Sequence, residues 1–147
     1  MRTAPTLRMR RVFVDTSAYY ALADPRDANH DAANTIAAGL VTHRPSQFTT
    51  NFILAETHAL VLARRGRNVA ARVLAHLDNS TMVRIRVSAK DERRAREIIA
   101  TYSDKAFTLT DATSFAVMDR LHIPYAFTFD DDFAQYGFSI LTPGTLP

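Results

Sequence analysis

The amino-acid sequence predicts an α/β domain built around a mainly parallel β-sheet. Two observations lead to this prediction. Short runs of β-branched and aromatic residues alternate with longer segments of helical periodicity, and no repeat or linker interrupts them. The chain has 147 residues, which fits one domain large enough to bury a core without disulfides. Strands that alternate with helices of this length are typically parallel, because each helix carries the chain back to the same end of the sheet.

The elements expected in the first half of the chain are a strand, two helices, a second strand and a third helix. Their ranges are 11–14, 16–22, 30–40, 47–50 and 51–65. Thr16 or Ser17 can cap the first helix and Asn51 the third, because their side-chain oxygens accept hydrogen bonds from the free N–H groups of a first turn. Gly66 ends the third helix.

The second half should contain three helices, a buried strand and two further strands, one of them at an edge of the sheet. The expected helices cover 69–77, 91–102 and 111–121, and the expected strands cover 82–87, 125–129 and 138–141. Ser88 and Thr110 are the expected caps of the last two helices. The charged residues at the start of the 91–102 helix, including Asp91, should be solvated.

Composition argues against several classes of protein. There is no cysteine, so disulfides, thiolate metal sites and a cysteine nucleophile are excluded. The histidines show no zinc-ligand spacing, and the four glycines form no phosphate-binding loop. No apolar run reaches the roughly 18 residues of a membrane span, and the basic N-terminus lacks the apolar segment of a signal peptide. We therefore expect a cytoplasmic protein without a membrane anchor.

The net charge is weakly basic, at +3 with a pI near 9.6, and only Lys90 and Lys105 are lysines. The planar guanidinium of arginine suits bidentate contact with phosphate, which is compatible with a nucleic-acid partner. A solvated, arginine-rich surface explains the same charge equally well. The positions of the acidic residues are more informative.

Four acidic residues do not occupy ordinary surface positions. Asp15 and Asp130 each follow a strand of buried type, at the carboxyl end where open α/β sheets bind ligands. Glu56 lies in a helix that is apolar nearly all round and should therefore be buried. Asp111 opens a helix, with Ser114 one turn further on the same face.

Each of these acids also has a structural interpretation. Asp15 can cap the helix that follows it, although Thr16 and Ser17 leave it free for other work. Glu56 can pair with an arginine, and Asp111 can stabilise its helix through the macrodipole. Asp130 can belong to an acidic turn with Asp131 and Asp132, and Asp132 is an alternative fourth member of the site.

Placed together at one sheet edge, the four acids predict a metal site. Like charges about 4 Å apart repel by roughly 4 kcal/mol at an effective dielectric constant near 20, so such a cluster needs a cation. Carboxylate oxygens favour Mg²⁺ or Mn²⁺ over zinc or copper. Such ions can activate water for phosphodiester hydrolysis, which predicts a nuclease. Thr16, Ser17, Ser114 and Asp132 are the expected auxiliary residues.

Four stretches of the chain carry a resemblance to the PIN-domain family, and specifically to the toxin ribonucleases of VapBC-type toxin–antitoxin pairs. They occur in the family's order and cover nearly the whole chain. They are Val12-Phe13-Val14-Asp15-Thr16-Ser17, Thr49-Thr50-Asn51-Phe52-Ile53-Leu54-Ala55-Glu56, Phe107-Thr108-Leu109-Thr110-Asp111-Ala112-Thr113-Ser114-Phe115 and Ala126-Phe127-Thr128-Phe129-Asp130-Asp131-Asp132-Phe133.

The resemblance implies a Rossmann-like, three-layer fold with four to five strands, and Mg²⁺ or Mn²⁺ held by Asp15, Asp111, Asp130 and Glu56. It further implies endonucleolytic cleavage of RNA, homodimerisation and inhibition by a small antitoxin protein that binds over the active site. Two other functions stay open: a nuclease that acts on DNA or in RNA processing, and a non-catalytic binding module.

The resemblance also divides the chain into an N-terminal extension, residues 1–10, and a PIN-like nuclease domain, residues 11–147. Members of the family usually begin just before the first strand. Met9 would therefore be a more typical first residue than Met1.

Overall fold

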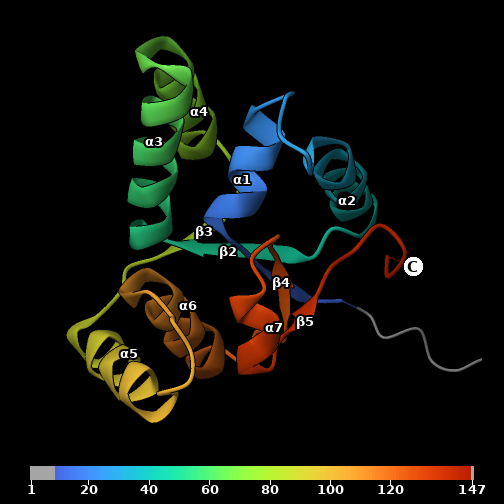
Figure 1. The fold of residues 1–147 in the computed structure, drawn as a ribbon. Helices are drawn as coiled ribbons and strands as arrows, with labels where there is room; N and C mark the ends of the chain where they lie inside the picture. Colours follow the sequence, from blue (N-terminus) through green and yellow to red (C-terminus); the bar gives the residue numbers. More distant parts are fainter. Residues whose placement is uncertain (1–8, 147) are drawn as a thin grey trace, which may run out of the picture.

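Five parallel strands form the central sheet, in the order β3-β2-β1-β4-β5 (Figure 1). The computed structural model describes residues 9–146. The strands are β1 (Arg11–Val14), β2 (Ser46–Thr50), β3 (Val83–Ile85), β4 (Tyr125–Phe127) and β5 (Ser139–Ile140). The helices are α1 (Thr16–Ala23), α2 (His30–His43), α3 (Asn51–Arg65), α4 (Arg67–Asp78), α5 (Ala89–Thr101), α6 (Leu109–Arg120) and α7 (Asp132–Tyr136).

The helices cover the two faces of the sheet, with α1–α4 on one side and α5–α7 on the other (Figure 1). The strand order explains this division. The connections β1 to β2 and β2 to β3 run in one direction along the sheet, whereas β3 to β4 and β4 to β5 run in the opposite direction. Crossovers between parallel strands are nearly always right-handed, so reversing the direction moves the helices to the other face. The predicted Rossmann-like, three-layer fold with a parallel sheet is confirmed.

The reversal of strand order has a consequence for function. The chain passes to one side of β1 first and to its other side later, so β1 and β4 flank a topological switch point. In open α/β sheets the crevice at such a point, beyond the carboxyl ends of the strands, is where ligands bind. Asp15 and Thr128 are the first residues beyond these two strand ends.

The core lies on both faces of the sheet. Val12, Phe13 and Val14 are at most 1% exposed, because β1 is the central strand and has helices on either side of it. Met9, at the end of the predicted extension, packs into the same core, whereas residues 1–8 lie outside the described part of the chain. Within residues 9–146, no helix has the length and apolarity needed to cross a membrane.

Three helices are capped by a residue that lies one or two positions before the cap expected from the sequence. The caps are Asp15, Thr50 and Thr108, whereas Thr16 or Ser17, Asn51 and Thr110 were expected. Each true cap has an extended backbone, with ψ of 163–164°, so its side-chain oxygen reaches an N–H group two or three residues further along. The expectation that Asp15 would be free of a capping role was therefore wrong.

Three strands are also shorter than predicted. The expected 138–141 strand covers only Ser139–Ile140. The expected 82–87 strand ends at Ile85, since the N–H group of Val87 donates to the Asn51 side chain at 2.8 Å. The expected 125–129 strand ends at Phe127, since the N–H group of Phe129 donates to the Ser17 hydroxyl at 2.9 Å. At the ends of β3 and β4, a side chain competes with the sheet for a backbone group.

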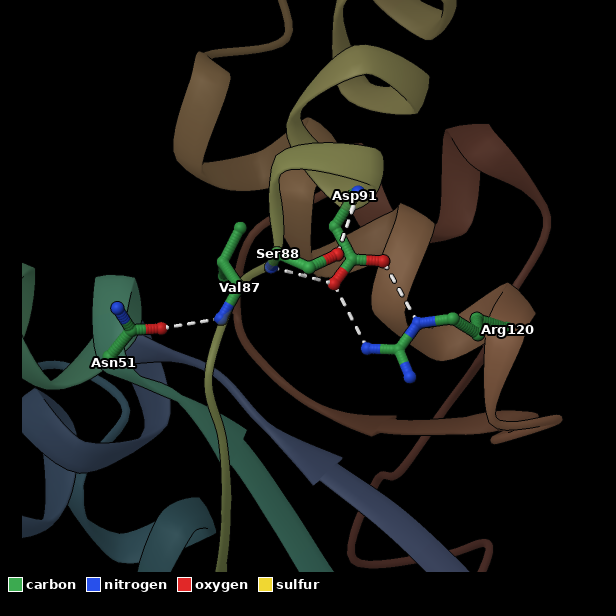
Figure 2. Close-up of polar contacts among 5 residues, drawn as sticks. All are labelled: Asn51, Val87, Ser88, Asp91 and Arg120. Atoms are coloured by element: carbon green, nitrogen blue, oxygen red, sulfur yellow. Dashed lines mark hydrogen bonds and ion pairs between the residues drawn. The ribbon is translucent and has the colours of Figure 1, made fainter.

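Asp91 was expected to be solvated but is buried, at 3% exposure (Figure 2). The reason is a partner 29 residues away: Arg120 of α6 donates to both oxygens of Asp91, each at 2.9 Å. Asp91 also forms a capping box with Ser88 at the start of α5. The ion pair joins the beginning of α5 to the end of α6, and so clamps the two helices into one antiparallel unit.

Candidate active site

Three carboxylates meet beside the switch point of the sheet. Asp111, Asp130 and Asp132 each offer an oxygen within 4.8 Å of the other two. Asp111 comes from the first turn of α6, Asp130 from the loop after β4, and Asp132 is the first residue of α7. The sequence left Asp130 and Asp132 as alternatives for one position, and the structure places both in the same cluster.

Hydrogen bonds from the backbone fix two of these carboxylates. The Thr108 N–H group donates to Asp111 Oδ2 at 3.2 Å, and Asp111 N–H donates to the Thr108 hydroxyl at 3.1 Å, so Asp111 belongs to a capping box. Asp130 Oδ1 accepts from the N–H group of Asp132 at 2.9 Å. Both side chains are therefore held before any ligand binds.

Aromatic packing brings α6 and α7 together beneath the cluster. Phe115, one turn after Asp111, lies edge-on to Phe133 with ring centroids 5.0 Å apart, and it stacks on Tyr136 at 4.6 Å. Phe133 directly follows Asp132. Both phenylalanines are fully buried, so the packing that forms the core also holds Asp111 beside Asp132.

The proximity of these acids changes their protonation. Burial raises the pKa of Asp111 to about 7, reinforced by a hydrogen bond with Asp132 and by the charge of Asp130. Burial also raises the pKa of Asp130, with further contributions from the charges of Asp132, Asp131 and Glu56. A proton shared within the cluster therefore offsets repulsion near neutral pH, and a cation can do the same.

Asp15 lies next to this cluster but outside the 4.8 Å group. It is buried, at 4% exposure, and its Oδ2 atom accepts hydrogen bonds from the hydroxyls of Ser17 and Thr128, each at 2.9 Å. Burial raises the pKa of Asp15, although these bonds act in the opposite direction. Ser17, predicted as an auxiliary residue, is thus in direct contact with Asp15.

Glu56 is exposed, so the prediction that it is buried was wrong. The buried residues of α3 are Ile53, Thr57 and Val61, which form one narrow stripe, and the remaining apolar residues of the helix are only partly covered. The charge of Glu56 helps to raise the pKa of Asp130, so Glu56 lies near the acidic cluster. It is placed at the rim of the site and not inside it.

Two other predicted auxiliary residues have different partners. The Ser114 hydroxyl donates to the carbonyl of Thr110 at 3.0 Å, within its own helix, and not to Asp111. The Thr16 hydroxyl accepts from the Thr57 hydroxyl at 3.4 Å, between α1 and α3. Sequence analysis also missed Thr128. The available signal was its place in the apolar run 125–129, which ends directly before Asp130.

The donor set fits a hard divalent cation. Three carboxylates within 4.8 Å, two of them with raised pKa values, supply oxygen ligands of the kind that Mg²⁺ and Mn²⁺ prefer. The described residues offer no cysteine and place no histidine in this cluster, so the donor set does not favour zinc.

Comparison with known proteins agrees with this geometry. The family model of the PIN domain matches residues 12–139, which includes all the acids described above. The chain belongs to the PIN-domain family. Among curated proteins, this PIN domain is 37% identical over 133 residues to the 23S rRNA-specific endonuclease VapC20 of Mycobacterium tuberculosis. The match covers 90% of this chain and 98% of VapC20.

Solved structures support the same assignment. The crystal structure of M. tuberculosis VapC20, described as a sarcin-ricin loop cleaving toxin, superposes on this PIN domain with a TM-score of 0.83 and 33% identity, over 90% of this chain and 99% of that one. VapBC2 from Rickettsia felis, bound to a promoter DNA fragment, gives a TM-score of 0.67 at 12% identity, with coverages of 89% and 97%. FitAcB from Neisseria gonorrhoeae gives 0.63 at 13%, with coverages of 90% and 98%. The last two comparisons establish the fold alone.

Proposed function

We propose that this protein is a Mg²⁺- or Mn²⁺-dependent endoribonuclease that acts in the cytoplasm as the toxin of a toxin–antitoxin pair. The observation that carries the proposal is the cluster of Asp111, Asp130 and Asp132 at the switch point of the sheet. The similarity to VapC20 supports RNA as the substrate, and 23S rRNA is the first RNA to test.

In this proposal, metal binding and proton transfer are assigned to different residues of the site. Asp111, Asp130 and Asp132 would hold the cation, with Asp15 beside them. When bound, the cation supplies a water of lowered pKa and stabilises the leaving oxygen of the phosphodiester. Asp111 and Asp132, which share a proton in the metal-free protein, would release it on holding the cation. Glu56, at the exposed rim, is free to orient the attacking water or to accept its proton.

A substitution at Glu56 tests this division. Because the side chain is exposed and makes no contact in the core, Glu56→Gln should leave the melting temperature unchanged while lowering the cleavage rate at least about 10-fold. The measurement is cleavage of 23S rRNA fragments in Mn²⁺, alongside thermal unfolding. Glu92→Gln, on α5 away from the site, is the matched control. Equal rates in both variants would remove Glu56 from the mechanism.

The same assay separates the other two functions. Cleavage of a DNA of matched sequence at the same rate as RNA would favour a DNA nuclease, and cleavage confined to precursor RNAs would favour RNA processing. A wild-type protein that binds RNA but cleaves no nucleic acid with either metal would favour a binding module. Homodimerisation, which the family resemblance implies, stays a prediction that light scattering can test.

The proposal includes a small antitoxin protein as partner. The family resemblance implies that this protein binds over the active site, and the structure offers a separate groove suited to a further segment of it. A groove of about 930 Å³ lies between α1, α2, α4 and the edge strand β3. Its walls are mostly apolar, with Val41 74% exposed and Val83 41% exposed. Arg44 and Arg72 also line it, and no acidic residue among residues 9–146 does. This composition suits an amphipathic segment that carries acidic residues.

This partner assignment has its own test. Val41→Glu places a charge in the groove, far from the carboxylates, so the variant should still cleave RNA. It should, however, escape inhibition by the product of the short reading frame expected beside this gene. Co-expression and growth measurement show the difference, with Val41→Ala as the mild control. Inhibition of Val41→Glu equal to that of the wild type would place the antitoxin elsewhere.

A further inference from the structure

One hydroxyl group links the carboxylate of Asp15 to the backbone of Asp130, the two acids that follow the strand ends of the site. Thr128 directly follows β4 and lies beside Asp15 in the sheet register, since Val14 pairs with Phe127 one residue earlier. Its hydroxyl donates to Asp15 Oδ2 at 2.9 Å and accepts from the N–H group of Asp130 at 3.0 Å. Thr128 is 1% exposed, so water does not compete for these bonds.

We propose that Thr128 is a positioning residue, whose single hydroxyl fixes both Asp15 and Asp130 for metal binding. The inference rests on the proposed function, because it concerns the metal site of that function. It assigns a role to a side chain that is not itself a carboxylate and that offers no ligand to the cluster.

One arrangement of protons satisfies the carboxylate, both hydroxyls and both N–H groups of the network. Asp15 is the acceptor, so the Thr128 and Ser17 hydroxyls both donate to it. Their own oxygen atoms then accept the N–H groups of Asp130 and Phe129. The two hydroxyl oxygens lie 3.1 Å apart and act as a pair. Each one connects a carboxylate after β1 to the backbone after β4.

This network determines which oxygen of the Asp15 carboxylate is available to a ligand. Oδ2 receives three donors, namely the two hydroxyls and the N–H group of Ser17, and a carboxylate oxygen has two lone pairs. The two hydroxyl bonds, each at 2.9 Å, fill this capacity, and the N–H contact at 3.4 Å is the weakest of the three. Oδ1 is therefore the oxygen that would be available to a cation. On the other side, the bond from Asp130 N–H fixes the loop from which the Asp130 carboxylate extends.

The contribution of Thr128 differs from that of ordinary packing. Thr49 is an equally buried threonine on the neighbouring strand β2, and its hydroxyl donates to the carbonyl of Val14 at 3.1 Å and contacts no carboxylate. The two residues differ in what their hydroxyls hold, while their burial is the same. Thr49 is therefore the matched control.

The test is Mn²⁺ binding by calorimetry to Thr128→Val, which keeps the shape of the side chain and removes the hydroxyl. We expect the affinity to fall about 10- to 100-fold, the range typical of residues that orient metal ligands. Thr128→Ser restores the hydroxyl and should bind within about 3-fold of wild type, as should Thr49→Val. In RNA cleavage, Thr128→Val should lower kcat and leave KM nearly unchanged.

Two outcomes would overturn the inference: Mn²⁺ affinity of Thr128→Val equal to that of Thr49→Val, or a Thr128→Ser variant as weak as Thr128→Val. Thr128→Ala, which removes the same hydroxyl from a smaller side chain, takes the place of the valine variant if that variant does not fold. A wild type that binds no Mn²⁺ would contradict the proposed function instead, so the two failures are distinguishable.

Discussion

Asp111→Asn is expected to inactivate the enzyme and, at the same time, to make the metal-free protein more stable. Cleavage should fall more than about 100-fold, because a ligand of the cation is lost. The free energy of unfolding at pH 8 should rise by about 2–4 kcal/mol, since a pKa near 7 in place of 3.8 means that the folded protein disfavours the charged carboxylate. Asparagine still offers an oxygen to the N–H group of Thr108.

The pH dependence of this effect has a definite sign. Between pH 4 and pH 7 the folded protein binds a proton at Asp111 that the unfolded chain has already released. The stability of the wild type therefore falls as the pH rises through this window and levels off above pH 7. The advantage of Asp111→Asn should be absent near pH 4 and largest above pH 7.

Urea unfolding at several pH values, with and without Mg²⁺, measures both effects. Mg²⁺ should stabilise the wild type, by about 2.7 kcal/mol at 100 times its dissociation constant, and should not stabilise the variant. Asp31→Asn is the control, because Asp31 is exposed on α2 and its charge does not contribute to the raised pKa of Asp111 or Asp130. If Asp111→Asn were less stable than the wild type at pH 8, the cost of burying the charged carboxylate beside Asp130 and Asp132 could not be the dominant effect.

Asp91→Ala is expected to destabilise the protein by about 2 kcal/mol, without acting on the site directly. The substitution removes both bonds from Arg120 and the capping box with Ser88. The Arg120 side chain is 44% exposed, so water solvates its guanidinium in the variant and adds no large penalty. Glu97→Ala is the matched control on the same helix. It breaks an exposed pair with Arg94 and should cost less than about 1 kcal/mol.

Acid should weaken the same ion pair in the wild type. Burial alone would raise the pKa of Asp91, but the bonds from Arg120 and Ser88 outweigh it and hold the pKa below its ordinary value. The stabilisation is therefore complete above the pKa of the unfolded chain, near 3.8, and is lost as the pH falls through the lower, folded value. Unfolding of the wild type and Asp91→Ala at pH 6 and pH 2.5 measures this, and a gap that does not narrow at the lower pH would contradict it.

The sequence was sufficient to predict the parallel sheet and the position of Asp15 and Asp130. Both acids follow short buried strands, and parallel strands end at the same edge, so local pattern fixes a tertiary position. Asp132 could not be separated from Asp130 in this way. Its place in the cluster depends on the packing of Phe133 against Phe115, which joins residues far apart in the chain.

The environments that the sequence did not predict are those of side chains whose neighbours in space are remote in the sequence. Glu56 lies in an apolar segment, and periodicity does not reveal that α3 is covered by its neighbours along one stripe only. Asp91 looks like one of several surface charges until α6 brings Arg120 against it (Figure 2). The role of Thr128 could not be predicted, because a buried threonine and a buried valine occupy the same positions in a strand pattern. Each of these environments arises from the tertiary fold.

The strand order also determines the stage of protein synthesis at which the acidic site can assemble. Its members come from the end of β1, the first turn of α6 and the start of α7, so they span residues 15 to 132 of a 147-residue chain. β4 must insert beside β1 before Asp130 can approach Asp111. A growing chain therefore holds no assembled site until the segment up to residue 132 has left the ribosome. Under the proposed function, the protein would be unable to cleave RNA before that point in its synthesis.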